Sequence, residues 1–443
     1  MITRLKAFWQ SVNASYWFFP ALFALSALVL ALVTTWLDKN GYAETIQKLP
    51  WLDAARPQSA TDMLTVISSS MIGVASTVFS ITIAAVAYAS GTYGPRLLTN
   101  FMEDRGNQLS LATFIGTFVY SVTILRNVRA EGESPLFAAQ QDALPGFVPQ
   151  LSLLVAYVFM AVAIMVLVFF LNHVPASIRI NSVLEGIGSR LLKEIETRYD
   201  KPNRGAVELE QSDGRPIHAR QTGYIQIVDY ERLRKLVERE KGRLALEVRP
   251  GDFVHPGMVM AFWRELDDLH EPLDLPDDDV RDCFAFGAMR TTSQDLQFLI
   301  DELVEIGLRA LSPGVNDPFT AVTSIHWLGA AVAELVPRDL AVRYGEDEDP
   351  NNDLLIPLRD DFDHFIERSF GAMRGAVATS RIASLVTFDA LINASLMLDD
   401  AHRRRVITRA GDRLIEQIRE NITGPDLVDL EARYVIFTQK LAR

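Results

Sequence analysis

Four long stretches of the chain are apolar and almost free of charged side chains. They cover about residues 17–37, 63–93, 108–126 and 148–173. A helix needs about 20 apolar residues to cross the hydrocarbon core of a bilayer. The pattern therefore predicts a transmembrane domain of four helices in residues 1–176. Trp17 and Trp36 stand near the two ends of the first stretch, where tryptophan side chains commonly reach the headgroup layer.

The second apolar stretch carries a regular stripe of small side chains. Its members recur every three or four residues, which places them on one side of a helix: Ser69, Gly73, Ser76, Ser80, Ala84 and Ala87. Small residues let membrane helices approach closely, and serine hydroxyls form hydrogen bonds across such contacts. We therefore expect the stripe to be a packing face at the centre of a helical bundle, with the wall of a water-filled path as the alternative.

The pattern changes after the fourth stretch. Apolar residues from Ile180 to Ile195 recur at helical spacing, and they predict a connector helix. The following segment up to Arg220 is polar and rich in turn-forming residues, which is typical of a linker. Residues 177–220 are therefore expected to form a connector helix and a linker.

Short alternating segments predict a small β-rich subdomain at residues 221–288. The expected strands are Tyr224–Val228, Leu244–Val248, Phe253–Val254 and Met258–Trp263. Asp229 is expected to cap a helix that ends at Gly242. The spacing of the turns resembles half of the barrel-sandwich hybrid fold of lipoyl and biotinyl carrier domains. The attachment lysine of such carriers is missing from the turn, so we expect the shape without the carrier chemistry and without a cofactor.

Residues 289–443 are predicted to form a helical domain. Thr292 and Asp295 suggest a capping box ahead of a helix with one apolar side, and Asp317-Pro318 suggests the start of the next helix. Further helices are expected at residues 361–379, 381–398, 402–422 and 426–441. The predicted fold is mainly α: a four-span transmembrane helical bundle followed by a cytoplasmic α+β domain with a small β barrel-sandwich-like unit and a helical bundle.

Charge is concentrated in the second part of the chain. Residues 174–443 hold 34 Lys/Arg and 47 Asp/Glu, so this part carries the whole net charge of −13. Such a surface repels nucleic acid and concentrates cations. Cys283 is the single cysteine of the sequence, which excludes an internal disulfide and fits a reducing compartment.

Two blocks of the sequence resemble the signature of a known family. The first holds Arg290-Thr291, Gln294-Asp295 and the run Arg309–Ala321, and it includes Ser312, Pro313, Gly314, Asn316, Asp317 and Pro318. The second holds Tyr93–Leu98, Phe101, Asp104, Asn107-Gln108 and Gly116–Tyr120. Both are similar to domain of unknown function 2254, a family of predicted bacterial membrane proteins. The resemblance implies an inner-membrane protein with a cytoplasmic C-terminal domain, and it implies no activity.

Four spans place both ends of the chain on one side of the membrane, and we expect the N- and C-termini to be cytoplasmic. The loop between the second and third spans then lies on the cytoplasmic side. It holds Arg96, Asp104, Arg105 and Asn107, which are candidates for a gate at a cytoplasmic mouth. The alternative is a salt-bridged turn whose arginines set the topology.

Catalytic and metal-binding patterns are weak. Asp317 invites an interpretation as a general base with Arg290 or Arg309 as its partner, but helix capping explains the aspartate equally well. The seven histidines show no zinc spacing. Residues 347–353 echo a calcium loop, yet Asn352 and Leu358 replace its glycine and its bidentate glutamate. We expect no metal, no cofactor and no enzymatic activity.

Two functions remain from different classes. The first is a homo-oligomeric, channel-like pore for ions, gated by its acidic cytoplasmic domain. The spans contain no Asp, Glu, Lys or Arg at bilayer depth, which disfavours a coupled transporter but permits an uncharged path lined by hydroxyls. The second is a non-transporting scaffold or sensor whose helical domain binds a partner or a small ligand. The expected partners are the lipid bilayer, further copies of the chain and cations.

Overall fold

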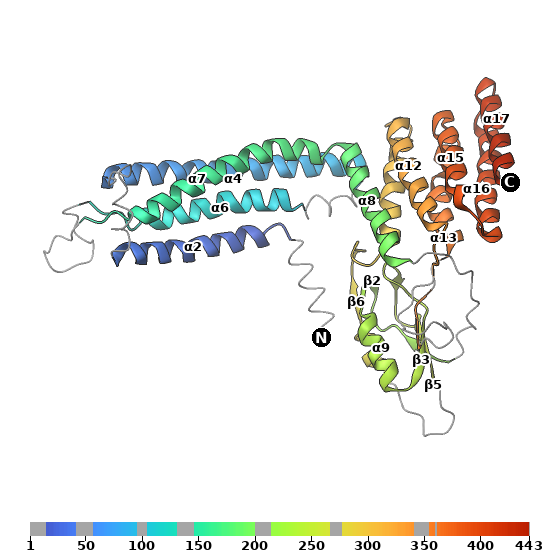
Figure 1. The fold of residues 1–443 in the computed structure, drawn as a ribbon, viewed down its shortest axis with the longest axis horizontal. Coiled ribbons are helices and arrows are strands. Elements are labelled where there is room, and N and C mark those ends of the chain that lie inside the picture. Colours follow the sequence, from blue (N-terminus) through green and yellow to red (C-terminus); the bar gives the residue numbers. More distant parts are fainter. Residues whose placement is uncertain are drawn as a thin grey trace. The chain divides into compact units, whose positions relative to one another are not determined.

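The computed structural model describes most of the chain (Figure 1). The described residues are 15–40, 56–94, 104–130, 146–199, 214–265, 277–340, 354–358 and 361–442. The chain divides into two compact units, Ser11–Arg179 and a second unit that holds Ile180–Arg443. We call them the membrane unit and the C-terminal unit.

The membrane unit contains four helices that are long and apolar enough to cross a bilayer. They are α2 (Phe18–Lys39), α4 (Pro57–Tyr93), α6 (Arg105–Leu125) and α7 (Gln150–Ser177). The prediction of four membrane-spanning helices is confirmed. α4 begins at Pro57 instead of Met63, because proline at the first helical position starts the helix before the apolar run does.

Helix α6 is the central helix of this unit, since it packs against α2, α4 and α7. Much of its surface is buried, including the polar side chains of Asn107, Gln108 and Thr117. The exposed tryptophans Trp17 and Trp36 flank α2. The 19 helical steps from Trp17 to Trp36 span about 29 Å, close to the thickness of a hydrocarbon core of about 30 Å.

The C-terminal unit begins with helix α8 (Ile180–Arg198) and contains two small sheets. The strands are β1 (Arg215–His218), β2 (Gly223–Val228), β3 (Gly242–Leu246), β4 (Phe253–Val254), β5 (Val259–Glu265), β6 (Phe284–Gly287) and β7 (Leu355–Ile356). One sheet has the order β1-β5-β3-β7 and the other β4-β2-β6. All neighbouring strands are antiparallel except β3 and β7, which are parallel. Two short helices, α9 (Tyr230–Arg239) and α10 (Asp277–Arg281), accompany the sheets.

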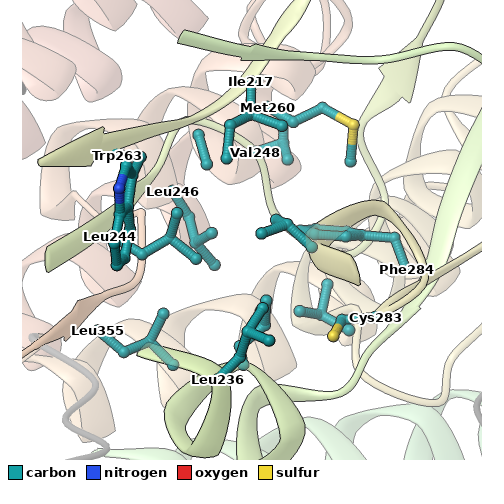
Figure 2. Packing of buried hydrophobic residues seen from close by; sticks show 14 of the residues in the cluster. Ile217, Leu236, Leu244, Leu246, Val248, Met260, Trp263, Cys283, Phe284 and Leu355 are labelled. Carbon is teal, nitrogen blue, oxygen red and sulfur yellow. The ribbon is translucent and has the colours of Figure 1, made fainter. Parts of the chain in front are cut away.

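Both sheets and α9 share one apolar core (Figure 2). The indole of Trp263 covers Gly242, where an added Cβ would lie 2.1 Å from the ring. Cys283 is fully buried in this core, and burial raises the pKa of its thiol to about 12. The thiol is therefore unreactive in the folded protein.

Several features of this subdomain differ from the prediction. Phe284–Gly287 forms strand β6, which was not expected. Residues Arg215–His218, expected in the linker, form the edge strand β1. Leu355–Ile356, from the predicted helical domain, adds β7 to the sheet, so the β-rich subdomain is not one continuous segment. Lys241 rather than Gly242 has the left-handed conformation (φ 49°) at the end of α9. Short strands such as these are specified by their long-range pairing rather than by local pattern.

The remaining elements are helical. They are α11 (Leu296–Ala310), α12 (Pro318–Leu335), α13 (Phe362–Ile366), the π-helix η3 (Glu367–Gly371), α14 (Ala372–Val377), α15 (Arg381–Ala394), the 3₁₀ turn η4 (Ser395–Met397), α16 (Ala401–Asn421) and α17 (Pro425–Leu441). The expected helix at 361–379 is therefore interrupted by a π-helical turn, and the helix expected to reach Leu398 ends at Ala394.

These helices form three stacked helical hairpins. α11 pairs with α12, α14 is followed by α15, and α16 pairs with α17, while α12 packs on α15 and α15 packs on α17. Figure 1 shows α8, α12, α15 and α17 side by side. The capping box predicted at Thr292 is wrong: Asp295 itself is the N-cap of α11, and its carboxylate accepts a hydrogen bond from the backbone N–H of Phe298 (3.0 Å). Asp317 caps α12 as predicted.

Candidate functional site

The stripe of small residues lies on the exposed side of α4. All six members are exposed within the chain: Ser69, Gly73, Ser76, Ser80, Ala84 and Ala87. Apart from the adjacent residues and the backbone of α4 itself, no atom lies within 4 Å of the position that a Cβ would take at Gly73. The stripe is therefore not the packing face of the chain's own bundle, contrary to our first interpretation. Its contact with a second protein surface or with water stays a prediction.

The opposite side of α4 packs against the rest of the membrane unit. Its largest buried residues are apolar: Leu64, Ile67, Met71 and Val78. Ala60, Ser68, Ala75, Thr82 and Ala89 are buried beside them. At 100° per residue, this side lies roughly 180° around the helix axis from the stripe. α4 thus has two different faces, one used inside the chain and one left open.

Two hydroxyl groups of the stripe, those of Ser69 and Ser80, form hydrogen bonds within the helix. Ser69 donates to the carbonyl of Thr65 (2.7 Å), and Ser80 donates to the carbonyl of Ser76 (2.9 Å). Thr77 beside the stripe donates to the carbonyl of Gly73 (3.0 Å). Each hydroxyl oxygen retains lone pairs, so the stripe presents acceptors without a charge.

An Asp–His pair joins α6 to α7 at one end of the membrane unit. The Nε2 atom of His173 lies 2.9 and 3.0 Å from the two carboxylate oxygens of Asp104. Asp104 also caps α6 by accepting a hydrogen bond from the N–H of Asn107 (3.2 Å). The ring of Phe169 stacks on the imidazole, with 4.9 Å between ring centroids.

The other residues of the expected cytoplasmic mouth are placed differently. Arg105 is exposed, while Asn107 is buried and its side-chain oxygen makes no hydrogen bond. Arg96 lies outside the described residues. Gly106 leaves room for His173, since an added Cβ would lie 2.6 Å from Nε2. His173 was not predicted, because only the fold brings the end of α7 to the start of α6.

A second buried polar cluster occupies the other end of the bundle, and sequence analysis missed it. Asp38 near the end of α2 accepts hydrogen bonds from the N–H groups of Leu151 (2.9 Å) and Ser152 (3.0 Å) and from the Ser152 hydroxyl (2.6 Å). The Tyr120 hydroxyl donates to the carbonyl of Ser152 (3.2 Å) and lies 2.9 Å from the Thr34 hydroxyl. An aspartate therefore binds α7 at each end: Asp38 at its start and Asp104 near its C-terminus.

The first signature block forms an ion-pair network inside the C-terminal unit. Arg290 binds Asp295 (Nε to Oδ2, 2.6 Å) and Asp301, and Arg368 donates to both oxygens of Asp301 (2.7 and 2.6 Å). Burial opposes the negative charge of Asp301, but Arg368 and Arg290 lower its pKa below the ordinary value. Burial likewise opposes the charge of Arg290, yet Asp295 and Asp301 raise its pKa.

The same block connects several elements. The amide of Gln294 pairs with the backbone of Val228 in β2 (2.8 and 3.2 Å), and the carbonyl of Gln294 accepts a hydrogen bond from Arg198 of α8 (2.6 Å). Gly251 (φ +97°) approaches Asp295 so closely that a Cβ would lie 2.1 Å from its carboxylate. The block joins the connector helix, the sheets and α11.

The second part of this signature is the loop between α11 and α12. Ser312 donates to the carbonyl of Arg309 (2.6 Å), and the N–H of Asn316 (φ 49°) donates to Ser312 (2.9 Å). Both oxygens of Asp317 are used by Thr320, through its N–H (3.2 Å) and its hydroxyl (2.6 Å). Asp317 and Arg290 thus each have other partners and are not paired with one another in the geometry that a base and its partner require.

No metal site is built by the described residues, which contain no group of three or more His, Cys, Asp or Glu side chains able to hold an ion. The acidic run at 347–353 lies outside them. A small cavity beside the π-helix is lined by residues of α14, α15 and α16, among them Val377 and Leu414, and by neither Arg290 nor Asp317.

Comparison with known proteins adds a family and several relatives. Residues 13–393 match the family described as "Predicted membrane protein (DUF2254)". An uncharacterised protein of Mycobacterium bovis and one of Mycobacterium tuberculosis are each 30% identical over 351 residues. The match covers 77% of this chain but only 64% of each relative. No solved structure matches the chain.

Proposed function

We propose that the chain, which belongs to the DUF2254 family of predicted membrane proteins, assembles with copies of itself in the bacterial inner membrane into a channel-like pore for cations. The observation that supports this proposal is the stripe on the exposed side of α4, opposite the face that packs inside the chain. In the proposed assembly, α4 helices of neighbouring copies meet along or beside the stripe.

The chemistry of the stripe fits both helix contact and ion passage. Glycine and alanine let two helices approach closely, which is the main source of association between helices in lipid. Serine hydroxyls and backbone carbonyls can replace part of the hydration shell of a cation without any ionised group. The C-terminal unit, which carries the net charge of the chain, would raise the local cation concentration at the pore entrance.

Disulfide crosslinking tests the assembly. In a Cys283→Ala background, Ser76→Cys is expected to form dimers between chains when membranes are oxidised. Val168→Cys is the matched control, because Val168 is 65% exposed on α7 and lies away from the stripe. Crosslinking of both variants to the same extent, or of neither, would contradict an α4 interface.

Ion flux tests the pore. Purified protein in liposomes is expected to conduct cations, and Ser76→Leu is expected to reduce the flux several-fold while crosslinking at Ser69→Cys persists. Ile81→Leu is the control, since Ile81 is exposed on α4 outside the stripe and the change conserves volume. A silent wild-type protein, or equal flux in Ser76→Leu, would reject conduction.

A scaffold or sensor is the second proposal, and the stacked hairpins of the C-terminal unit favour it. Arrays of helical hairpins present extended surfaces that commonly bind partners. Photo-crosslinking in native membranes would identify a bound protein, and an electrically silent purified protein together with such a partner would favour this function over the pore. Neither proposal assigns chemistry to Asp317, which caps α12, or to Arg290, which is held in an ion pair with Asp295.

A further inference from the structure

The signature loop Ser312–Asp317 lies at the end of the C-terminal unit where α8 begins. Two contacts show that α8 and α12 run parallel. The ring of Trp327 covers Gly188, and a guanidinium nitrogen of Arg338 donates to the carbonyl of Tyr199 (2.6 Å). Both contacts join residues 139 positions apart. The same register places Phe319, at the start of α12, level with Ile180, the first residue of α8.

Contacts between α8 and α11 also place the loop at the level where α8 begins. Arg198 near the end of α8 binds the carbonyl of Gln294 just before α11, and Arg190 lies 3.6 Å from Glu302 in the middle of α11. α11 therefore runs antiparallel to α8, and its C-terminal end, followed by Ser312, also reaches the level of Ile180.

Chain connectivity brings this end close to the bilayer. Exposed apolar side chains on α7 continue as far as Leu171, after which Asn172 and His173 follow. Six helical steps, about 9 Å, lead from Leu171 to Ser177 at the end of α7. Only Ile178 and Arg179 then precede α8, and the three Cα–Cα steps from Ser177 to Ile180 span at most about 11 Å.

The loop bonds several of its polar atoms internally and exposes apolar side chains. The Ser312 hydroxyl, the backbone N–H of Asn316 and the Asp317 carboxylate form hydrogen bonds within the loop and to the ends of α11 and α12, while Asn316 itself is exposed. Val315 is 52% exposed and Phe319 is 70% exposed. Arg309 at the base of the loop is 39% exposed, and such a side chain can place its charge among headgroups while its stem remains in apolar surroundings.

We propose that this loop is a contact site for the lipid bilayer surface, with Val315 and Phe319 inserted at the level of the headgroups. An aromatic ring beside a polar, internally bonded backbone suits the interface, where apolar side chains lose contact with water and polar groups stay hydrated. The contact would fix the C-terminal unit to the membrane at a second point besides α7. In this proposal, the signature residues Ser312, Asn316 and Asp317 hold the two apolar side chains outward.

Depth-dependent quenching tests this contact in the full-length protein. In a Cys283→Ala background, Phe319→Cys is labelled with an environment-sensitive fluorophore, and the protein is placed in nanodiscs that contain lipids spin-labelled near the headgroup. Leu396→Cys is the control. Leu396 is 73% exposed in η4, and η4 contacts α12. Arg403, which follows η4 in the chain, binds the carbonyls of Leu335 and Val336 at the C-terminal end of α12. That is the opposite end of α12 from Phe319, about 27 Å away along the helix.

We expect the spin-labelled lipids to quench the fluorophore at position 319 at least several-fold more strongly than the fluorophore at position 396. A fluorophore at Val315→Cys is expected to be quenched to a similar extent, which would show that the result at position 319 is not a local effect of one substitution. Equal, weak quenching at 319 and 396 would overturn the proposal. A label at 319 that is shielded from water but not quenched by lipid, with one chain per nanodisc, would also overturn it, because the loop would then be covered by protein. Quenching does not depend on ion conduction, so the outcome is separate from that of the proposed pore.

Discussion

Asp38 caps helix α7 through Ser152. The residue before α7 is Pro149, which offers no capping side chain. The carboxylate of Asp38, which comes from α2, instead accepts the N–H groups of Leu151 and Ser152, two of the donors that a helix start leaves without an intrahelical partner. A negative charge at this position also complements the positive end of the helix dipole.

We expect Asp38→Ala to destabilise the membrane unit by about 2 kcal/mol, because it leaves buried donors at the start of α7 without an acceptor. Thermal unfolding in detergent, with near-ultraviolet circular dichroism as the signal, measures this loss. Asp62→Ala, which removes an exposed carboxylate on α4, is the control and should change little. An equal effect of both substitutions would contradict the capping role.

Two glycines in α8 provide a matched pair. An added Cβ at Gly188 would lie 2.2 Å from ring atoms of Trp327, whereas nothing lies within 4 Å of one at Gly186. Gly188→Ala is expected to cost more than about 2 kcal/mol by forcing α8 and α12 apart. Gly186→Ala is expected to stabilise by about 0.5 to 1 kcal/mol, because alanine has the higher helix propensity. Urea denaturation of the full-length protein compares them, and effects of the same sign would be inconsistent with the α8–α12 contact.

Gly106→Ala is expected to displace His173 from Asp104 and to reduce stability by about 1 kcal/mol through overcrowding. In a His173→Ala background the clash with the imidazole is absent and only Oδ1 of Asp104 stays close to the added Cβ (3.0 Å), so the same substitution should then cost less. A double-mutant cycle on thermal stability in detergent measures this coupling. An undiminished cost without His173 would show that Gly106 is needed for another reason.

The Asp301 ion pairs predict a pH dependence. Because the pKa of Asp301 is lowered in the folded protein, the unfolded chain binds its proton more readily. The stabilisation is therefore complete above the ordinary aspartate pKa of about 4 and is lost as the pH falls through the folded value. Asp301→Asn should cost about 3 kcal/mol at pH 7, and its difference from wild type should shrink below about pH 4. Denaturation curves from about pH 2 to pH 7 check this, and a difference independent of pH over that range would refute it.

Local signals accounted for much of the fold. The four apolar stretches predicted the membrane helices because length and hydrophobicity alone decide whether a segment can span a bilayer. Asp229 and Asp317 predicted helix starts because a cap depends on residues adjacent in sequence. The strands β1, β6 and β7 were missed, since two to four residues carry too little pattern and depend on partners far along the chain.

The sequence by itself determined the class of the protein: four membrane helices, a charged second part and a stripe of small residues on one helix. Only the tertiary structure decided which side of α4 packs inside the chain, because helical periodicity identifies two faces without saying which one meets a neighbour. It also decided the partners of Asp38, Asp104 and Asp301. Each of these charges is bound by a group distant in sequence, as with Asp38 and Ser152, so no local pattern predicts the pair before the helices are packed.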